Sequence, residues 1–481
     1  MNYISLSFML FCLIGTIIYF NVSKRIQTWV LLLLNIFFYI YADYRYIFYL
    51  AFTIILTFFT AYIVDKTGSR KVKKYTTVCG VFICVAILFA VKYFTCASNL
   101  LGNITLGRDI VSLKLLVPLG ISFYTLQAIS YCLDVYNGKI NCEKNIVKYA
   151  VYLSYFPTIV QGPIVRYSDF EKQFAKKHCF DYVRVKEGLQ IVLYGLFKKL
   201  VIADRAALFV NDVWTNYANY GKSLIVFGVI LYSIQIYMDF SGCVDICRGI
   251  SKVLGIHIVN NFNAPYFATS IKDFWRRWHI SLSTWLRDYV YIPLGGNRKG
   301  KFRRYINLLI TFFISGLWHG VGLNYMVWGL LHGLYQIFGE MLLPFRKRFQ
   351  KKFNVKTEVF SYRAMECALT FVLVSFSWIF FRSNGLREAI NIIKAIKNNQ
   401  WIMSFAAQKA IDQKDLFVLF WATIIVFFVS YFQQKYSISK WINQQNIWFR
   451  WGVYFAVIFC IMIFGIYGSG YNAETFIYMQ F

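Results

Sequence analysis

Long apolar blocks separated by short charged segments set the pattern of this chain. A typical block, "TTVCGVFICVAILFAVKYF" from Thr76, has the roughly 20 residues that a helix needs to cross the hydrocarbon core of a membrane. Several blocks contain Gly or Pro, which indicates that some helices are broken or re-entrant. The pattern predicts an all-α polytopic membrane protein with about 11–13 transmembrane or re-entrant helices.

The expected crossings are distributed along almost the whole chain. The stretch Val151–Pro163 is interrupted by Pro157 and Pro163, so we expect a re-entrant or broken helix there rather than a full crossing. The first apolar block lacks a basic leader and a cleavage site, which favours a retained helix over a signal peptide. The predicted crossings lie near residues 4–20, 28–42, 46–64, 76–95, 115–133, 222–242, 305–320, 323–343, 363–383, 414–432 and 449–467.

The charged segments predict the orientation. The chain has 51 Lys and Arg against 22 Asp and Glu, and the excess gathers in loops at Asp65–Lys74, Gly295–Arg304 and Phe345–Lys356. Basic loops of multi-pass proteins face the cytoplasm. The number of crossings between these loops and each end of the chain then predicts that the N-terminus and residues 468–481 lie on the extracytoplasmic side. This explanation of the net charge of +29 makes nucleic-acid binding a poor alternative and favours a protein of the cytoplasmic membrane, surrounded by membrane lipids.

Composition strengthens this interpretation. Residues are 58% hydrophobic and only 15% charged, whereas an ordinary soluble domain has about a quarter charged residues. We find no internal repeat and no linker long enough to separate a soluble domain. The sequence therefore predicts a single membrane domain over residues 1–481, with 468–481 as an extracytoplasmic tail.

The segment Ile271–Gly300 is the most unusual stretch in the chain. It combines aromatic and charged residues in the manner of an interfacial helix that anchors rings and extends its cations to water. At helical spacing Trp275, His279 and Leu282 share a face, so we expect a continuous helix that directs His279 toward the bundle. An interfacial anchor explains about half of this composition and leaves the imidazole on the apolar face unexplained.

Two further histidines, His319 and His332, lie among residues that suit hydrocarbon. Gly316 and Gly320 flank His319 and allow another helix or a ligand to approach the backbone closely. On one continuous helix the two rings would be about 20 Å apart, so they are not expected to share a metal ion. The eleven cysteines contain no CxxC pair, and the sequence predicts no metal site. A buried imidazole is either a structural hydrogen-bonding group or a catalytic one.

Two carboxylates, Asp239 and Asp245, interrupt the apolar block 222–242 and the residues just beyond it. Carboxylates at such a depth need partners, and we expect ion pairs with Arg276, Arg277 or Arg287.

Taken together, these motifs resemble the membrane-bound O-acyltransferase superfamily, and within it the bacterial branch of alginate and peptidoglycan O-acetyltransferases. Teichoic acid D-alanyltransferases are more distant relatives of that branch. The matching motifs occur in order along nearly the whole chain: "PLGISFYTLQAISYCLDVYNG" (118–138), "YFPTIVQGPIVRYSDF" (155–170), "GLFKKLVIAD" (195–204), "IQIYMDFSGCVDI" (234–246), "DFWRRWHISLSTWLRDYVYIPLGGNRKG" (273–300), "SGLWHGVGLNYMVWGLLHG" (315–333), "SFSWIFFRS" (375–383) and "FIYMQF" (476–481). One departure is Leu323, where relatives more often have an aromatic residue.

The resemblance implies a ring of helices around a central tunnel and the transfer of an acyl group from a cytoplasmic thioester toward an envelope polymer. By position, His319 matches the superfamily's catalytic histidine and His279 the second histidine of the bacterial branch. A neutral imidazole suits the removal of a hydroxyl proton during acyl transfer. Trp318 and Asn297 are expected to orient substrate or stabilise the oxyanion, and Tyr478 in the terminal motif is a candidate acyl relay.

The expected donor is acetyl-CoA, with no tightly bound cofactor. The expected partner is an extracytoplasmic transferase or esterase of the SGNH type, and the product is an O-acetylated polysaccharide of the cell envelope or an exported one. One alternative within the superfamily is transfer of D-alanine or acylation of a lipid or lipid-linked sugar; relatives that transfer D-alanine usually carry the terminal aromatic motif on a separate small protein. A transporter is a third hypothesis, but it predicts paired inverted halves, which the sequence does not display.

Overall fold

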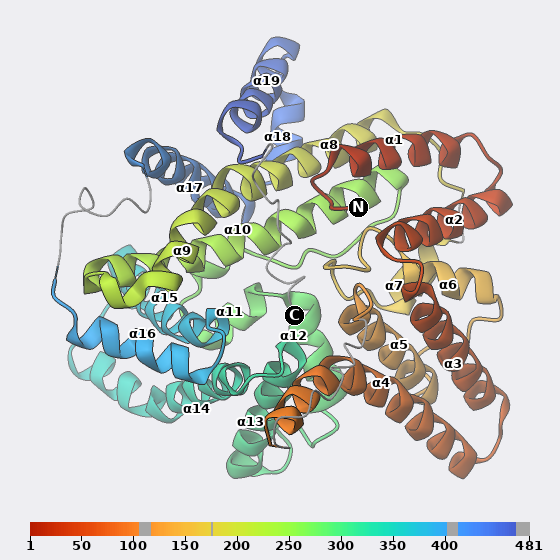
Figure 1. Ribbon diagram of the computed structural model, residues 1–481, viewed down its shortest axis with the longest axis horizontal. Helices are drawn as coiled ribbons and strands as arrows, with labels where there is room; N and C mark the ends of the chain where they lie inside the picture. The colour runs from red at the N-terminus through yellow and green to blue at the C-terminus, as the bar shows by residue number, and fades with distance from the viewer. Residues whose placement is uncertain (105–116, 175–176, 402–411, 468–481) are drawn as a thin grey trace. The chain divides into compact units, whose positions relative to one another are not determined.

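The computed structural model describes residues 1–104, 117–174, 177–401 and 412–467, and every described segment is helix, turn or loop (Figure 1). The described part contains no β-strand, which confirms the predicted all-α class. The described residues divide into two compact units with interleaved boundaries, residues 1–192 with 244–259 and residues 193–243 with 260–467. The prediction of a single domain stays a prediction.

The first unit contains mostly apolar helices, and a buried amide of α2 supports the broken chain after α6. Asn35 donates its side-chain N–H to the Ser154 hydroxyl at 3.1 Å, and its side-chain oxygen accepts the Phe156 backbone N–H at 2.9 Å. The predicted break in Val151–Pro163 is therefore confirmed, because α6 ends at Ser154 and turns follow. Its helices are α1 (Leu6–Phe20), α2 (Lys24–Ala42), α3 (Tyr46–Lys66), α4 (Arg70–Ile104), α5 (Ile121–Tyr136), α6 (Ile146–Ser154), α7 (Tyr167–Phe174) and most of α8 (Tyr182–Leu196).

The second unit contains the histidine motifs. Helix α10 contributes its first part to this unit and its last turns to the other. The elements are η1 (Phe197–Ala203), α9 (Asp204–Asn216), η2 (Tyr217–Asn219), α10 (Lys222–Leu254), η3 (Pro265–Phe267), α11 (Ile271–Arg277), α12 (Ile280–Leu286), η4 (Arg287–Tyr291), α13 (Gly300–His319), α14 (Leu323–Lys352), α15 (Phe360–Arg382), α16 (Leu386–Asn398), α17 (Gln413–Gln433), α18 (Ile438–Gln444) and α19 (Ile447–Phe464).

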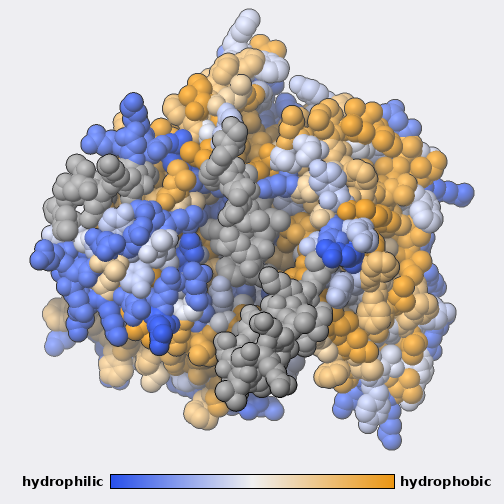
Figure 2. Space-filling view, viewed as in Figure 1, coloured by the Kyte–Doolittle hydropathy of each residue, from blue (hydrophilic) through white to orange (hydrophobic). Residues whose placement is uncertain are grey.

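Seven helices in the described residues are long and apolar enough to cross a membrane. Their outward faces carry large exposed apolar side chains such as Phe48 and Phe82, and Figure 2 shows such residues gathered over α1 to α3. In water this surface would be unfavourable, whereas in a bilayer it meets lipid. The seven are Lys24–Ala42, Tyr46–Lys66, Arg70–Tyr93, Lys222–Leu254, Phe360–Arg382, Gln413–Gln433 and Ile447–Phe464, and the shorter α1 is also apolar.

The predicted crossings near 305–320 and 323–343 are helical too, as α13 and α14, which pack side by side (Figure 1). Glycines allow the close approach. A Cβ atom on Gly316 would lie 2.4 Å from the carbonyl oxygen of Tyr325, and one on Gly329 would lie 2.3 Å from that of Phe312. Backbone therefore touches backbone along this hairpin, as the glycine beside His319 led us to expect.

Candidate functional site

His319 is the last residue of α13 and is only 2% exposed. The helix ends there because Gly320 is extended, with φ of −175°, and its N–H bonds back to the Gly316 carbonyl. Three aromatic side chains meet the imidazole nearly edge to face, namely Trp318 at 4.8 Å, Trp328 at 5.0 Å and Phe381 at 5.2 Å between ring centroids. The ring is therefore held in one place by packing.

The start of α14 completes this pocket of aromatic residues and is fixed by one buried amide. Asn324 donates to the backbone carbonyls of Phe380 and Ser383 at 3.1 and 2.8 Å. This ties the first turn of α14 to the last turn of α15, which carries Phe381. Since Phe381 touches His319, the Asn324 amide also fixes one of the aromatic side chains that pack against the imidazole.

His279 is 1% exposed, but the continuous helix expected around it is wrong. Helix α11 ends at Arg277, and His279 adopts φ of 44° as the residue that precedes α12. A non-glycine residue in this left-handed region is uncommon, and such residues concentrate at functional sites. The expected inward direction of the ring is nevertheless confirmed by its burial.

Asn261 connects His279 to the start of α12. Its side-chain carbonyl oxygen accepts the Ser281 N–H at 2.8 Å, and its amide nitrogen lies 3.3 Å from His279 Nδ1. His279 lies outside the candidate membrane spans, and burial lowers its pKa to about 3, so the ring is neutral near pH 7.

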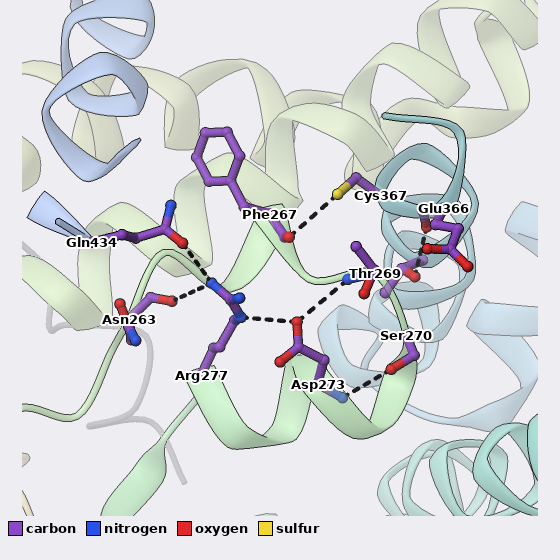
Figure 3. A network of polar contacts seen from close by, with 10 residues as sticks. Asn263, Phe267, Thr269, Ser270, Asp273, Arg277, Glu366, Cys367 and Gln434 are labelled. Carbon is purple, nitrogen blue, oxygen red and sulfur yellow. Dashed lines mark hydrogen bonds and ion pairs between the residues drawn. The ribbon is translucent and has the colours of Figure 1, made fainter. Parts of the chain in front are cut away.

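A polar network fixes the segment that leads to His279 (Figure 3). Ser270 caps α11 by accepting the Asp273 N–H at 3.2 Å, and the Asp273 carboxylate pairs with Arg277 at 2.9 Å. Arg277 also donates to the Asn263 carbonyl at 3.4 Å and to the Gln434 side chain at 2.9 Å. Arg277 therefore holds the short helix in place.

The structure joins the two predicted catalytic histidines through Trp318. The Trp318 ring centroid lies 4.8 Å from that of His319 and 6.2 Å from that of His279. Phe240 of α10 meets the other side of His279 edge to face at 4.8 Å. Three of the predicted site residues thus form one contiguous group.

Asn297 is not part of that group in the described structure. Asn297 is exposed in the glycine-rich turn, and its side-chain oxygen accepts the Tyr291 hydroxyl at 2.5 Å. The described contacts of Asn297 include neither histidine. Tyr478 lies outside the described residues.

His332 has both ring nitrogens hydrogen-bonded. Trp275 Nε1 donates to His332 Nδ1 at 3.2 Å, and Ser377 Oγ lies 2.8 Å from Nε2. Ser377 donates its own proton to the Val374 carbonyl, so His332 Nε2–H must be the donor in that contact. The ring is a neutral link between α11, α14 and α15.

The separation of about 20 Å expected for His319 and His332 is wrong, because the chain does not form one continuous helix there. Helix α13 ends at His319, and α14 begins at Leu323 and folds back against it. Both imidazoles meet Trp328, at 5.0 and 5.2 Å between ring centroids. The described residues contain no group of three or more His, Cys, Asp or Glu side chains that would hold a metal ion.

The arginine partners expected for Asp239 and Asp245 are also wrong. Asp239 pairs with Lys199 at 2.5 Å, and the same ammonium lies 2.8 Å from Asp204. Asp245 pairs with Arg248 on its own helix at 3.0 Å. Lys199 is 40 residues from Asp239, and no local pattern connects them, although the motif "GLFKKLVIAD" contains both Lys199 and Asp204.

Sequence reasoning missed two residues beside His319, Ser315 and Trp328. Both lie in the stretch "SGLWHGVGLNYMVWGLLHG", and Ser315 precedes His319 by one helical turn. That spacing was the available signal for Ser315. The position of Trp328 depends on how α14 folds back, which the spacing alone does not show.

Comparison with known proteins shows the family of the chain. Residues 33–381, which include both predicted catalytic histidines, match the model of the membrane-bound O-acyltransferase family. The chain is 35% identical over 380 residues to a probable alginate O-acetylase AlgI of Pseudomonas syringae pv. tomato, covering 77% of this chain and 70% of the relative. It is 33% identical over 398 residues to a peptidoglycan O-acetyltransferase of Helicobacter pylori, covering 76% and 73%.

A teichoic acid D-alanyltransferase of Bacillus subtilis is 30% identical over 230 residues, covering 45% of this chain and 57% of that protein. The family match, the helical fold and the apolar helices agree on a multi-pass membrane acyltransferase. The chain belongs to the membrane-bound O-acyltransferase family.

Proposed function

We propose that this membrane O-acyltransferase moves an acetyl group from cytoplasmic acetyl-CoA across the membrane for O-acetylation of a cell-envelope or exported polysaccharide, with His319 as the catalytic base. The observation that carries the substrate class is the similarity to alginate and peptidoglycan O-acetylating proteins over about three-quarters of the chain. The observation that supports the base is the burial of His319 among aromatic side chains that exclude water.

The chemistry requires a base at the acceptor hydroxyl. An unprotonated imidazole of His319 takes the hydroxyl proton as the oxygen attacks the thioester carbonyl, and later returns a proton to the leaving thiolate. His279 is neutral and touches Trp318, so we propose that it holds this indole, and through it His319, in the reactive geometry. Asn297 on the exposed turn would assist in orienting the donor.

For the extracytoplasmic half of the reaction we propose a relay. The terminal motif "FIYMQF" provides the Tyr478 hydroxyl, which would accept the acetyl group and pass it to an SGNH-type transferase or esterase. This relay requires the C-terminal tail to lie on the extracytoplasmic side. The number of crossings counted from the basic loops predicts the same position. Tyr478→Phe should retain the protein in the membrane and abolish polymer acetylation in cells; full acetylation in that variant would exclude the relay.

Transfer of D-alanine is the second candidate, since teichoic acid D-alanyltransferases also match part of the chain. Their matches cover half of this chain or less, which favours acetyl transfer.

The deciding experiment supplies radiolabelled donors to the full chain in proteoliposomes. Wild-type protein should take label from acetyl-CoA and not from a D-alanyl carrier protein. His319→Ala should lose about 10²–10⁴ in rate, the usual contribution of a general base, while keeping its thermal unfolding midpoint. Label transfer from the D-alanyl donor alone, or unchanged turnover in the variant, would contradict the proposal.

A further inference from the structure

Two buried hydrogen-bond donors beside His319 have no acceptor among the described residues. Ser315 Oγ and Trp328 Nε1 are each unpaired, and both side chains are 0% exposed. Leaving such a group unpaired costs about 1–3 kcal/mol, so buried donors nearly always have a partner. Two such unpaired donors near the same imidazole indicate a binding site for a molecule with an acceptor oxygen.

Both residues are neighbours of His319 in the hairpin of α13 and α14. Ser315 is one helical turn before His319 on α13, so the two side chains share a face of that helix. Phe312, on the same face, meets Trp275 at 5.2 Å between ring centroids, which shows that this face points into the tryptophan cluster. Trp328 enters the cluster from α14, with its ring perpendicular to the imidazole at 5.0 Å.

Other polar groups of the same cluster are paired, so the missing acceptors are not a general property of it. Trp275 Nε1 has His332 as its acceptor, and Ser377 is bonded to both His332 and Val374. The Trp378 indole stacks on Trp328 and lies within reach of a side-chain hydrogen bond to the Tyr266 hydroxyl. Among the described residues, Ser315 and Trp328 are the two that combine an unpaired donor with a position next to the predicted base.

We propose that Ser315 Oγ–H and Trp328 Nε1–H bind the carbonyl oxygen of the acyl group during transfer and stabilise the oxyanion that forms there. This inference rests on the proposed function of His319. It makes Ser315 and Trp328 catalytic residues, because both touch the reacting oxygen.

The reaction balances with these groups alone. The acceptor hydroxyl oxygen bonds to the thioester carbon, its proton goes to His319, and the carbonyl electron pair moves onto oxygen between the two donors. The pair then returns, the carbon–sulfur bond breaks, and His319 gives its proton to the thiolate. A thioester and an alcohol have become an ester and a thiol. Donors fixed in a dry site stabilise such an oxyanion more than they stabilise the neutral carbonyl.

The test compares four variants of the full chain in proteoliposomes with acetyl-CoA. Ser315→Ala and Trp328→Phe should each lower kcat about 10²-fold, as loss of one oxyanion donor does, with KM for acetyl-CoA changed by less than about 3-fold. Ser375→Ala, which loses a paired buried hydroxyl, and Trp378→Phe, which loses the stacked indole, are the matched controls and should stay within about 3-fold of wild type.

Ser315→Thr keeps the hydroxyl and should recover most of the rate lost in Ser315→Ala. If Trp328→Phe does not fold, the comparison of Ser315→Ala with Ser315→Thr still tests the inference. Wild-type kcat in Ser315→Ala, or equal losses in the serine variant and its control, would overturn the inference. If His319→Ala is inactive while Ser315→Ala and Trp328→Phe are fully active, only this inference fails; if His319→Ala is itself active, the proposed function fails.

Discussion

The surroundings of His332 and of His319 differ, although both imidazoles touch the same indole, Trp328. Both ring nitrogens of His332 are hydrogen-bonded, with Trp275 and Ser377 as partners. Near His319, the Ser315 hydroxyl and the Trp328 indole have no acceptor within the described chain. Trp328 contacts both rings, so Ser315, one helical turn before His319, is the unpaired donor that distinguishes the two surroundings.

The two buried histidines therefore differ in what their burial contributes. His332 links three helices and remains neutral, so its contribution is to stability. His319 is positioned by aromatic contacts and by the helix break at Gly320, which favours chemistry. Variants that change the stability of the protein test this difference, and the largest effect is expected where α13 meets α14.

The largest loss of stability should follow from Gly329→Ala. The new Cβ would lie 2.3 Å from the Phe312 carbonyl oxygen, so α13 and α14 must move apart, and overpacking of this kind costs about 1–3 kcal/mol or more. Both histidine regions should be affected, with lower yield and lower kcat. Gly339→Ala on the same helix is the control, since a Cβ there meets nothing within 4 Å. Equal thermal midpoints in the two variants would show that the hairpin contact is unimportant.

A smaller effect is expected from Ser377→Ala, which removes the acceptor of His332 Nε2–H. A buried donor left without a partner costs about 1–3 kcal/mol, and the unfolding midpoint should fall accordingly. The value of kcat per folded molecule should stay within about 2-fold of wild type, because His319 keeps its surroundings. A large loss of kcat at an unchanged midpoint would mean that the His332 region takes part in the reaction.

The smallest effect concerns pH and His279. Burial lowers the pKa of His279 to about 3, whereas an unfolded histidine has a pKa of about 6.5. Below pH 6.5 the unfolded chain binds a proton that the folded chain does not, so stability falls by up to about 1.4 kcal/mol per pH unit. Between pH 7 and 5 the unfolding midpoint of wild type should therefore drop more than that of His279→Asn. Parallel curves for the two proteins would contradict a neutral buried His279.

Much of the fold follows from the sequence because apolar blocks of membrane-spanning length are a strong local signal. The helix break after Ser154 and the close approach at Gly316 were also predictable, since proline and glycine act on their own backbone. The partner of Asp239 was not, because Lys199 is distant in the sequence and Arg277, one of the arginines that we expected to pair with it, instead pairs with Asp273 of α11.

For the site, the sequence identified His319, His279 and Trp318, which the structure brings together. It did not predict the left-handed backbone at His279, since the helical spacing of Trp275 and Leu282 continues across the break. Nor did it predict that His332 shares an indole with His319, because that contact depends on the turn between α13 and α14.

The most direct test of the account measures kcat for acetyl transfer from acetyl-CoA by His319→Ala and His332→Ala in the same proteoliposome preparation, normalised to folded protein. We expect kcat to fall about 10²–10⁴-fold in His319→Ala, with little change in the unfolding midpoint. For His332→Ala we expect a lower unfolding midpoint, with kcat per folded molecule within about 3-fold of wild type. Equal losses of kcat in the two variants, or the greater loss in His332→Ala, would contradict the assignment of His319 as the base.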